Sequence, residues 1–257
     1  MNVIEARHLW KEYGDNVVLE NISVAVKAGE FITVVGTSGC GKTTFLKMLL
    51  GVEPRSRGEL LLDGKPLPDE PSAERGIVFQ RYSVFPHLNV LENVMLGAEL
   101  GVSPLWGRTF GKQRKAIQTQ AKAMLESVGL GAALHQYPSA LSGGMQQRLA
   151  LAQALIKKPR ILLLDEPFGA LDPGIRADMH QLLLSIWQQT GITIFMITHD
   201  LKEGFHLGTR LWVFDKRRHD PQAPHRYGAT ITYDIPLGHT DRQTLQTIQQ
   251  SLGAHHA

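Results

Sequence analysis

The sequence predicts an α/β protein with a parallel-sheet core, an N-terminal antiparallel β segment and an inserted helical lobe. Three observations predict this class. Short apolar runs alternate with helical segments, two β-rich segments open the chain, and residues 88–158 are mainly helical in pattern. Alternating strands and helices imply parallel strands joined by right-handed crossovers. The length of 257 residues suits one large domain, or one domain with an inserted lobe.

The first third of the chain supplies the expected β segments and the first crossover helix. Residues 3–10 and 17–26 are rich in β-branched side chains and alternate loosely, as antiparallel edge strands do. Residues 31–35 form a short apolar run that ends at a glycine, which is typical of a buried parallel strand. The helix TTFLKMLLG follows and is closed by Gly51. Further short strands are expected at residues 59–62 and 76–79.

The rest of the chain continues the alternation after a helical lobe. The segment KQRKAIQTQAKAMLESVGL is amphipathic, with one apolar face made of Ile117, Ala121, Met124, Leu125 and Val128. The runs RILLL, ITIFMITHD and RLWVF predict strands, and GIRADMHQLLLSIWQQTG predicts a helix between the first two. A polar, proline-containing loop after Asp215 leads to a last strand near residues 230–235 and a frayed helix in the tail.

A glycine-rich loop follows the buried strand at residues 31–35. Residues 36–43, GTSGCGKT, fit G-x-x-x-x-G-K-[ST] at every fixed position. Such glycines turn backbone N–H groups towards a polyphosphate, Lys42 reaches the β- and γ-phosphates, and the Thr43 hydroxyl ligates Mg²⁺. The alternative is a plain glycine turn before a helix. The motif predicts a P-loop NTPase whose phosphate-binding residues are Gly36, Thr37, Ser38, Gly39, Cys40, Gly41, Lys42, Thr43 and Thr44.

An acidic pair follows a second buried strand, in ILLLDEP. Asp165 is placed to hold Mg²⁺, and Glu166, one residue later, is placed to act as general base for an attacking water. An acidic turn at a strand end is the alternative. Gly36 and His199 each come directly after an expected strand, so parallel strands would bring both to one edge of the sheet, where ligands bind.

One further motif narrows the class. The segment LSGGMQQR, residues 141–148, precedes the acidic strand by a single helix and resembles the signature motif of ABC transporter ATPases. Its serine and glycines open a helix, which makes a second anion site. The resemblance implies that ATP lies between two copies of the chain, a homodimer in which one copy's glycine loop faces the other's signature. It assigns nucleotide contacts there to Ser142, Gly143, Gly144 and Gln146.

The resemblance covers about residues 2–215 and assigns the remaining site residues. It implies that Tyr13 stacks on adenine, that Gln80 contacts Mg²⁺, and that His199 contacts the γ-phosphate. It also places Asp172, in FGALD, in a loop that crosses the dimer interface. The predicted catalytic residues are thus Lys42, Gln80, Glu166 and His199, and the predicted metal ligands are Thr43, Gln80 and Asp165. The domain is expected to span residues 1–240, with a short tail at 241–257.

The stretch VFQRYSVFPHLNVLENVMLG resembles the part of import ATPases that docks a permease, here at residues 80–88. The resemblance favours bacterial importers of the nitrate/sulfonate/taurine type, which act with transmembrane permease subunits and a periplasmic substrate-binding protein. Two alternatives are an exporter or lipid-trafficking ATPase, and a soluble ABC protein of DNA repair or translation. The transported solute is not encoded here, because it contacts the permease and the binding protein.

Composition is consistent with this class. Lys and Arg total 27 against 24 Asp and Glu. The sequence shows no concentrated basic face, which is the feature that would predict nucleic-acid binding. The short basic run Lys216-Arg217-Arg218 is expected in a solvated loop. Cys40 is the single cysteine, which fits a reducing compartment. No stretch approaches the roughly 20 apolar residues that span a bilayer. The resemblance to import ATPases implies a peripheral protein on the cytoplasmic face of the bacterial inner membrane.

Overall fold

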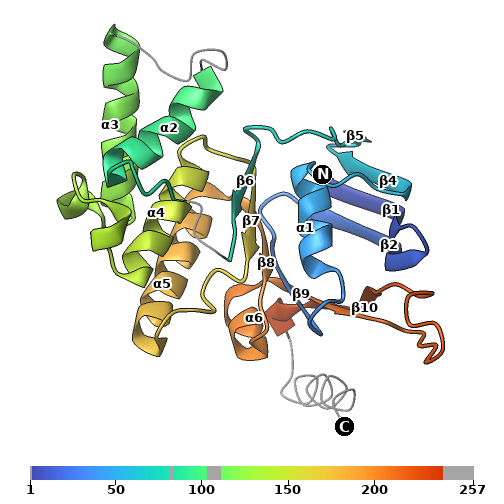
Figure 1. The fold of residues 1–257 in the computed structure, drawn as a ribbon. Helices are drawn as coiled ribbons and strands as arrows, with labels where there is room; N and C mark the ends of the chain where they lie inside the picture. Colours follow the sequence, from blue (N-terminus) through green and yellow to red (C-terminus); the bar gives the residue numbers. More distant parts are fainter. Residues whose placement is uncertain (1, 81–83, 103–110, 240–257) are drawn as a thin grey trace. The chain divides into compact units, whose positions relative to one another are not determined.

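The computed structural model describes residues 2–80, 84–102 and 111–239 (Figure 1). The chain forms two compact units, one made of residues 1–71 and 191–257 and the other of residues 72–190. Within the described ranges, every helix is too short or too polar to cross a lipid bilayer. The expected tail at residues 241–257 lies outside these ranges.

The first unit opens with an antiparallel sheet whose strand order is β2-β1-β4-β5. Both N-terminal strands predicted from the sequence are confirmed, and their hairpin closes where Tyr13 pairs with Asn16. Glycine at position 14 allows the turn, because its φ is +57°. The four strands are β1 (Asn2–Tyr13), β2 (Asn16–Lys27), β4 (Arg57–Leu62) and β5 (Lys65–Pro66).

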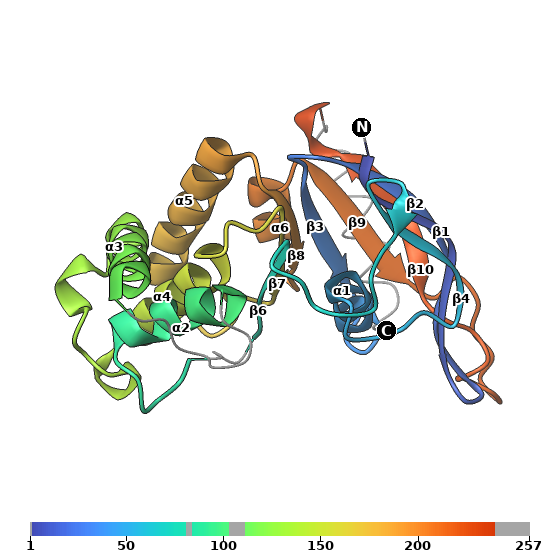
Figure 2. The same ribbon diagram turned by 90° about the horizontal axis from the view of Figure 1, so that it is seen from above.

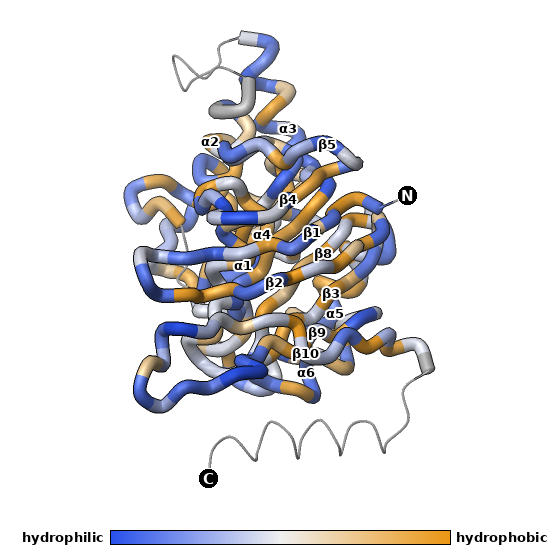
Figure 3. Tube along the Cα trace, turned by 90° about the vertical axis from the view of Figure 1, so that its right-hand side faces the viewer, coloured by the Kyte–Doolittle hydropathy of each residue, from blue (hydrophilic) through white to orange (hydrophobic). Residues whose placement is uncertain are grey.

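The same unit contains four strands in the order β10-β9-β3-β8. The central strand β3 runs parallel to both neighbours, while β10 is antiparallel to β9. Side chains along β3 and β8 are buried without alternation, as expected for strands covered on both faces, and Figure 3 shows hydrophobic colour along this part of the tube. The strands are β3 (Phe31–Gly36), β8 (Thr193–Ile197), β9 (Arg210–Asp215) and β10 (Thr230–Pro236).

Helix α1 (Lys42–Leu50) packs on β3 and β8 and supplies the aromatic core of the first unit (Figure 2). The Phe45 ring lies 6.0 Å from the Trp212 ring and 5.5 Å from the Phe214 ring, centroid to centroid. The helix ends at Gly51, whose left-handed backbone lets its N–H reach the Lys47 carbonyl, as the sequence predicted. The described part of the unit also contains two short elements, α6 (Leu201–Leu207) and η3 (Leu237–His239).

The second unit joins a parallel strand pair to a group of helices. Strands β6 (Arg75–Val78) and β7 (Ile161–Asp165) pair in register, with Val78 opposite Leu164. Helices α2, α3 and α4 contact one another and enclose a common apolar core (Figure 1). The helices are α2 (Val90–Val102), α3 (Gly111–Ser127), α4 (Gly143–Leu155) and α5 (Pro173–Thr190), with short turns η1 (Gly131–Ala133) and η2 (Pro138–Ala140).

The amphipathic face predicted for α3 is confirmed. Ile117, Ala121 and Leu125, spaced four residues apart, are buried in the helical core, and Met124 packs at its margin. Helix α2 begins with a reciprocal cap, because Asn89 Oδ1 accepts from the Glu92 N–H at 2.9 Å and Glu92 Oε2 accepts from the Asn89 N–H at 3.0 Å. These local signals fix where the helical part of the unit starts.

Candidate nucleotide site

The glycine loop between β3 and α1 adopts a conformation that side chains would prevent. Gly36, Gly39 and Gly41 have φ values of +150°, +78° and +92°. A Cβ on Gly36 would lie 2.2 Å from the Phe214 carbonyl oxygen, and one on Gly41 would lie 2.7 Å from Leu19 Cδ2. Gly36 and Gly41 therefore let the loop pack closely on its neighbours.

The loop fits a bound polyphosphate on two observations of this structure. A Cβ on Gly39 would meet nothing within 4 Å, so the outer side of the loop is open. Helix α1 starts at Lys42 behind an N-cap, Gly41, that has no side chain and makes no side-chain capping bond to the helix start. An anion at this helix start would meet backbone donors and the positive end of the helix dipole.

Lys42 is held inside the loop that it follows. Its Nζ donates to the carbonyl oxygens of Gly36 and Thr37, each at 2.8 Å, and its side chain is largely buried. The two carbonyl oxygens thus fix the ammonium beside the expected phosphate position. Of the other predicted loop residues, Ser38 and Thr43 are exposed, whereas Thr37 and Thr44 are half-buried.

Cys40 faces the interior of the loop. Its side chain is 4% exposed, and its Sγ lies 3.7 Å from Lys42 Nζ. Burial raises the pKa of the Cys40 thiol, while the Lys42 ammonium opposes the rise. The thiol is therefore protonated near neutral pH, which is a poor state for a nucleophile or a metal ligand.

Tyr13 stands at the end of β1 with an exposed ring, as a base-stacking residue must. Tyr13 is 48% exposed, and Lys11 Nζ lies 4.5 Å from the centroid of its ring. Lys11 is in turn fixed by an ion pair of 2.6 Å with Glu53. Burial, followed by the Glu53 carboxylate, raises the pKa of the Tyr13 phenol. Sequence reasoning missed Lys11 and Glu53, because the two residues come from separate segments of the chain.

His199 follows β8, at the same edge of the sheet as the glycine loop. Val34 of β3 pairs with Ile197 of β8, and the Thr198 N–H donates to the Val34 carbonyl at 3.0 Å. The parallel strands therefore bring Gly36 and His199 to one edge, as the sequence predicted. The imidazole is exposed, while the residues on either side of it are anchored. Thr198 donates to Glu203, and Asp200 caps α6 by accepting from the Lys202 N–H at 2.8 Å.

The acidic pair lies in the second unit, at the end of β7. Asp165 is 9% exposed, and Glu166 has a φ of +47°, which is uncommon for a residue with a side chain. Gln80, which follows β6, donates from Nε2 to Glu166 Oε2 at 3.0 Å. The strand pair β6-β7 thus brings together two predicted catalytic residues that are far apart in the sequence. Thr43, the third predicted metal ligand, belongs to the first unit.

The signature segment opens helix α4 as predicted. Ser142 is the N-cap, and its Oγ accepts from the Met145 N–H at 3.3 Å. Ser142 and Gly143 are exposed, so the helix start is accessible to an anion. Gly144 is buried, and a Cβ there would lie 2.5 Å from Ile175 Cγ2 of α5. Close packing of α4 on α5 therefore explains this glycine.

Gln146 and Asp172 complete the residues predicted at the dimer interface. Gln146 Nε2 donates to the carbonyl oxygens of Pro138 at 2.9 Å and Leu141 at 3.3 Å, so in this structure its amide supports the turn before the signature helix. Asp172 is exposed just before α5, and its carbonyl oxygen accepts from the Arg176 N–H at 2.9 Å. Their nucleotide contacts stay predictions.

A residue that sequence reasoning missed organises the predicted permease dock. Asn93 of α2 is fully buried, and its side chain bonds the segment just before the helix. Its Oδ1 accepts from the Phe85 N–H at 2.8 Å, and its Nδ2 donates to the Leu88 carbonyl at 2.8 Å. Phe85 itself is 42% exposed. The sequence did contain a signal for Asn93, because it is an amide residue on the otherwise apolar face of α2. Residues 81–83 of the dock lie outside the described residues.

The chain is similar to proteins of one family over most of its length. The family model described as ABC transporter matches residues 19–169. The taurine import ATP-binding protein TauB of Escherichia coli O157:H7 is 43% identical over 210 residues, which cover 81% of this chain and 78% of that protein. The aliphatic sulfonates import ATP-binding protein SsuB of Bacillus anthracis is 38% identical, covering 82% and 79%.

Two further comparisons extend the range. The spermidine/putrescine import ATP-binding protein PotA of Clostridium novyi is 39% identical over 84% of this chain, which spans 60% of the length of that relative. A dimeric structure of the ATP-binding cassette MJ0796, in a post-hydrolysis state bound to ADP and Pi, superposes with a TM-score of 0.72 at 26% identity, covering 92% of this chain and 100% of that chain. The predicted α/β fold, with its antiparallel N-terminal sheet and helical part, is thereby confirmed.

Proposed function

The chain belongs to the ABC transporter family, and from this premise we propose that it is the ATP-hydrolysing, energy-coupling subunit of a bacterial import system. ATP is its substrate and Mg²⁺ its metal. The proposal rests on two kinds of site in one chain. One is an open glycine loop at the start of α1, and the other is a serine-capped helix start at α4.

The hydrogen bond between Gln80 and Glu166 is the observation that carries the hydrolytic part of the proposal. Glu166 follows the buried β7 strand, and the Gln80 amide donates to one of its oxygens. The Glu166 carboxylate would accept a proton from the attacking water molecule, as a general base does. Asp165, one residue earlier, together with Gln80 and Thr43, would hold Mg²⁺. The bound ion would neutralise charge on the phosphate oxygens.

The other site residues bind and position ATP. Lys42, fixed by the carbonyl oxygens of its own loop, supplies a positive charge beside the phosphates. The exposed Tyr13 ring stacks on the adenine base, and its opposite face rests against Lys11. His199 follows β8 at the edge that carries the glycine loop, and it donates a hydrogen bond to the γ-phosphate.

A second copy of the chain completes each nucleotide site. The α4 helix start presents the Ser142 hydroxyl and the N–H groups of a glycine-rich turn, which suit a γ-phosphate. In the family arrangement, the glycine loop of one copy and the signature helix of the other copy act on the same nucleotide across a homodimer. ATP then joins two copies and hydrolysis separates them. The MJ0796 structure, which is dimeric, supports this arrangement.

The import role is supported by relatives named for taurine and aliphatic sulfonate import. We propose a small polar solute that contains nitrogen or sulfur, carried by transmembrane permease subunits that dock near residues 80–88. A periplasmic binding protein would deliver that solute. The chain would then lie at the cytoplasmic face of the inner membrane, bound through the permease.

The decisive experiment reconstitutes the chain with its permease subunits and measures phosphate release in lipid nanodiscs. We expect hydrolysis to rise when the cognate binding protein is added with taurine or an alkanesulfonate, and to stay at its basal rate with spermidine. Stimulation by spermidine alone would reject the solute class. Stimulation by a substrate on the cytoplasmic side, without a binding protein, would favour an exporter and reject import.

A further inference from the structure

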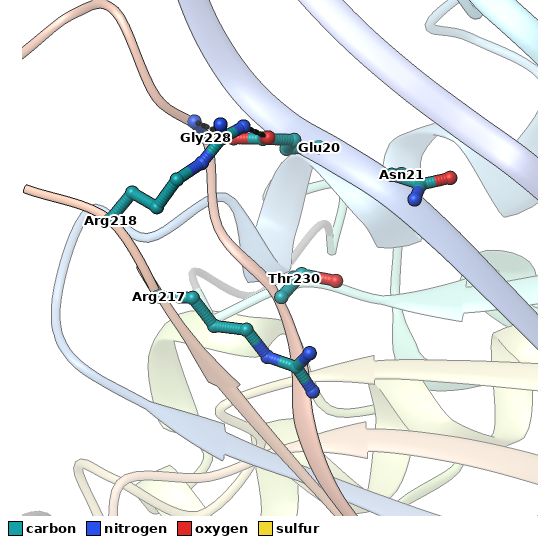
Figure 4. A pocket seen from close by; sticks show the side chains of 6 residues that line it. All are labelled: Glu20, Asn21, Arg217, Arg218, Gly228 and Thr230. Carbon is teal, nitrogen blue, oxygen red and sulfur yellow. Dashed lines mark hydrogen bonds and ion pairs between the residues drawn. The ribbon is translucent and has the colours of Figure 1, made fainter.

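A polar pocket lies in the first unit, between β2 and the loop that joins β9 to β10 (Figure 4). It has a volume of about 280 Å³ and is lined by Glu20, Asn21, Arg217, Arg218, Gly228 and Thr230. None of these residues belongs to the nucleotide site described above. The loop is strongly polar, with the sequence KRRHDPQAPHRYG over residues 216–228.

Main-chain contacts between the loop and β2 form the wall of the pocket. The loop is attached to β2 by backbone bonds, since the Glu20 N–H donates to the Ala229 carbonyl and the Ala229 N–H donates to the Val18 carbonyl, both at 2.9 Å. A Cβ on Gly228 would lie 2.9 Å from the Leu19 carbonyl carbon. Only glycine lets the loop approach the strand this closely, so the pocket is held by main-chain contacts.

One arginine of the pocket, Arg218, is held in place by an ion pair. Arg218 forms an ion pair with Glu20, and its guanidinium lies 4.2 Å from the Tyr227 ring centroid. The second Glu20 oxygen accepts from the Gly228 N–H at 3.1 Å. Both oxygens of the only carboxylate among the lining residues are therefore occupied, as the dashed lines in Figure 4 show.

The second arginine, Arg217, is not paired with a carboxylate of the pocket. Among the residues that the structure describes, the Arg217 side chain makes no hydrogen bond or ion pair, and Figure 4 shows it extended on the same side of the pocket as Thr230. Across the pocket, the Asn21 carboxamide oxygen lies 2.9 Å from His8 Nδ1, which leaves its NH₂ group as a donor. The pocket therefore offers a guanidinium, an amide NH₂ and a hydroxyl, and both oxygens of Glu20 are already bonded.

We propose that this pocket binds a small oxyanion, namely a phosphate, sulfate or sulfonate group, with Arg217 as its principal ligand. A guanidinium presents paired N–H donors that match two oxygens of such a group. The volume accommodates the group together with a short organic substituent. The proposal is independent of the nucleotide site, because no lining residue belongs to that site.

The test separates this pocket from the glycine loop, which also binds oxyanions. Titration calorimetry with sodium sulfate, and separately with methanesulfonate, is carried out on the full-length Lys42→Ala protein at constant ionic strength. We expect saturable binding that survives the loss of Lys42. Adding Arg217→Ala should weaken it about tenfold, the effect of losing a charge-assisted hydrogen bond. Thr230→Val should weaken it less.

The matched control is Arg226→Ala, which removes an equal charge from the same loop. Arg226 does not line the pocket, and its Nη1 lies 3.5 Å from Asp220 Oδ2 at the surface. This variant should bind sulfate within about twofold of its parent, because screened charges outside the pocket contribute little. Equal weakening by both substitutions, or no saturable binding to the Lys42→Ala protein, would overturn the proposal. Unchanged thermal unfolding verifies that each variant is folded.

Discussion

Gln80 Nε2 donates a hydrogen bond of 3.0 Å to Glu166 Oε2, across 86 positions of sequence. The two residues meet because β6 and β7 run parallel and in register, which brings their carboxyl ends together. The bond fixes one oxygen of the Glu166 carboxylate and therefore restricts the rotation of this carboxylate. Glu166 also has a left-handed backbone conformation, so both its main chain and its side chain are constrained.

The first prediction concerns Glu166 as general base. Glu166→Gln keeps the size of the side chain and an amide oxygen that can accept the Gln80 bond, but it cannot take up a proton. Phosphate release should fall by about 10²- to 10⁴-fold, while ATP binding persists. Size-exclusion chromatography with MgATP should then show a stable dimer.

Glu126→Gln supplies the control, because Glu126 is an exposed residue of α3 and its substitution changes the charge equally. Its rate of phosphate release should match that of the unmodified protein. Hydrolysis at the normal rate by the Glu166 variant would show that another group is the base.

The second prediction separates two roles of Ser142, as helix cap and as phosphate ligand. Ser142→Asp retains a good N-cap, since a carboxylate also accepts from the Met145 N–H. Thermal unfolding without nucleotide should therefore change little. The new negative charge should repel the γ-phosphate, so ATP-dependent dimerisation and hydrolysis should be lost.

Ser142→Asn is the matched variant, because it caps the helix without a charge. It should keep part of the ATP-dependent dimer. If the aspartate variant dimerises with ATP as the unmodified protein does, Ser142 does not face a triphosphate in the dimer.

Much of the fold was predictable because the strongest patterns are local. The strands β3, β7 and β8 are continuous apolar runs, and the glycine loop is fixed by its spacing. The boundaries of helices and strands follow the same kind of local signal. Two of them differ by one residue, because α1 begins at Lys42 and β6 spans Arg75–Val78, each one residue earlier than expected. The seven-residue helix α6 was not predicted, because it is too short to show a helical period.

Contacts between distant segments could not be predicted from local patterns. The Lys11–Glu53 pair that supports the Tyr13 ring joins a strand to the segment after α1. The bond between Gln80 and Glu166 needs the order of the strands, which the sequence only implies. Asn93 gave a weak signal as an amide on an apolar helix face, but its partners became visible only in the structure.

The third prediction follows from the raised pKa of Cys40. Alkylation requires the thiolate, and burial raises the pKa of this thiol above its ordinary value. A raised pKa keeps the proton bound to a higher pH, so the rate of reaction with iodoacetamide should rise at more alkaline pH than for a free thiol. Mass spectrometry can follow the reaction at a single site, because the chain has one cysteine.

The comparison for this measurement is the same chain unfolded in urea, where the thiol should react with an ordinary pH profile. Added ATP should slow alkylation of the folded protein further, because Cys40 lies within the phosphate loop. Coincident profiles for the folded and unfolded chain would mean that the loop does not bury the thiol in solution.

The last prediction concerns Asn93 and the segment that it holds. Asn93 bonds Phe85, Leu88 and Asn89 through one fully buried side chain, and it receives a bond from Gln153. Asn93→Leu keeps a similar volume but leaves several backbone groups without their partner. Each such group costs about 1–3 kcal/mol when it stays buried, so urea unfolding should show a clear loss of stability. The segment around Phe85 should also loosen.

This loosening should separate hydrolysis from coupling, since Asn93 holds the predicted dock and is not among the residues proposed to bind ATP. Basal phosphate release by the isolated variant should therefore remain, measured below its unfolding transition, while co-purification with the permease should fall. Gln120→Leu, the same kind of substitution at an exposed position of α3, should affect neither property. Normal permease binding by the Asn93 variant would mean that the segment before α2 does not form the dock.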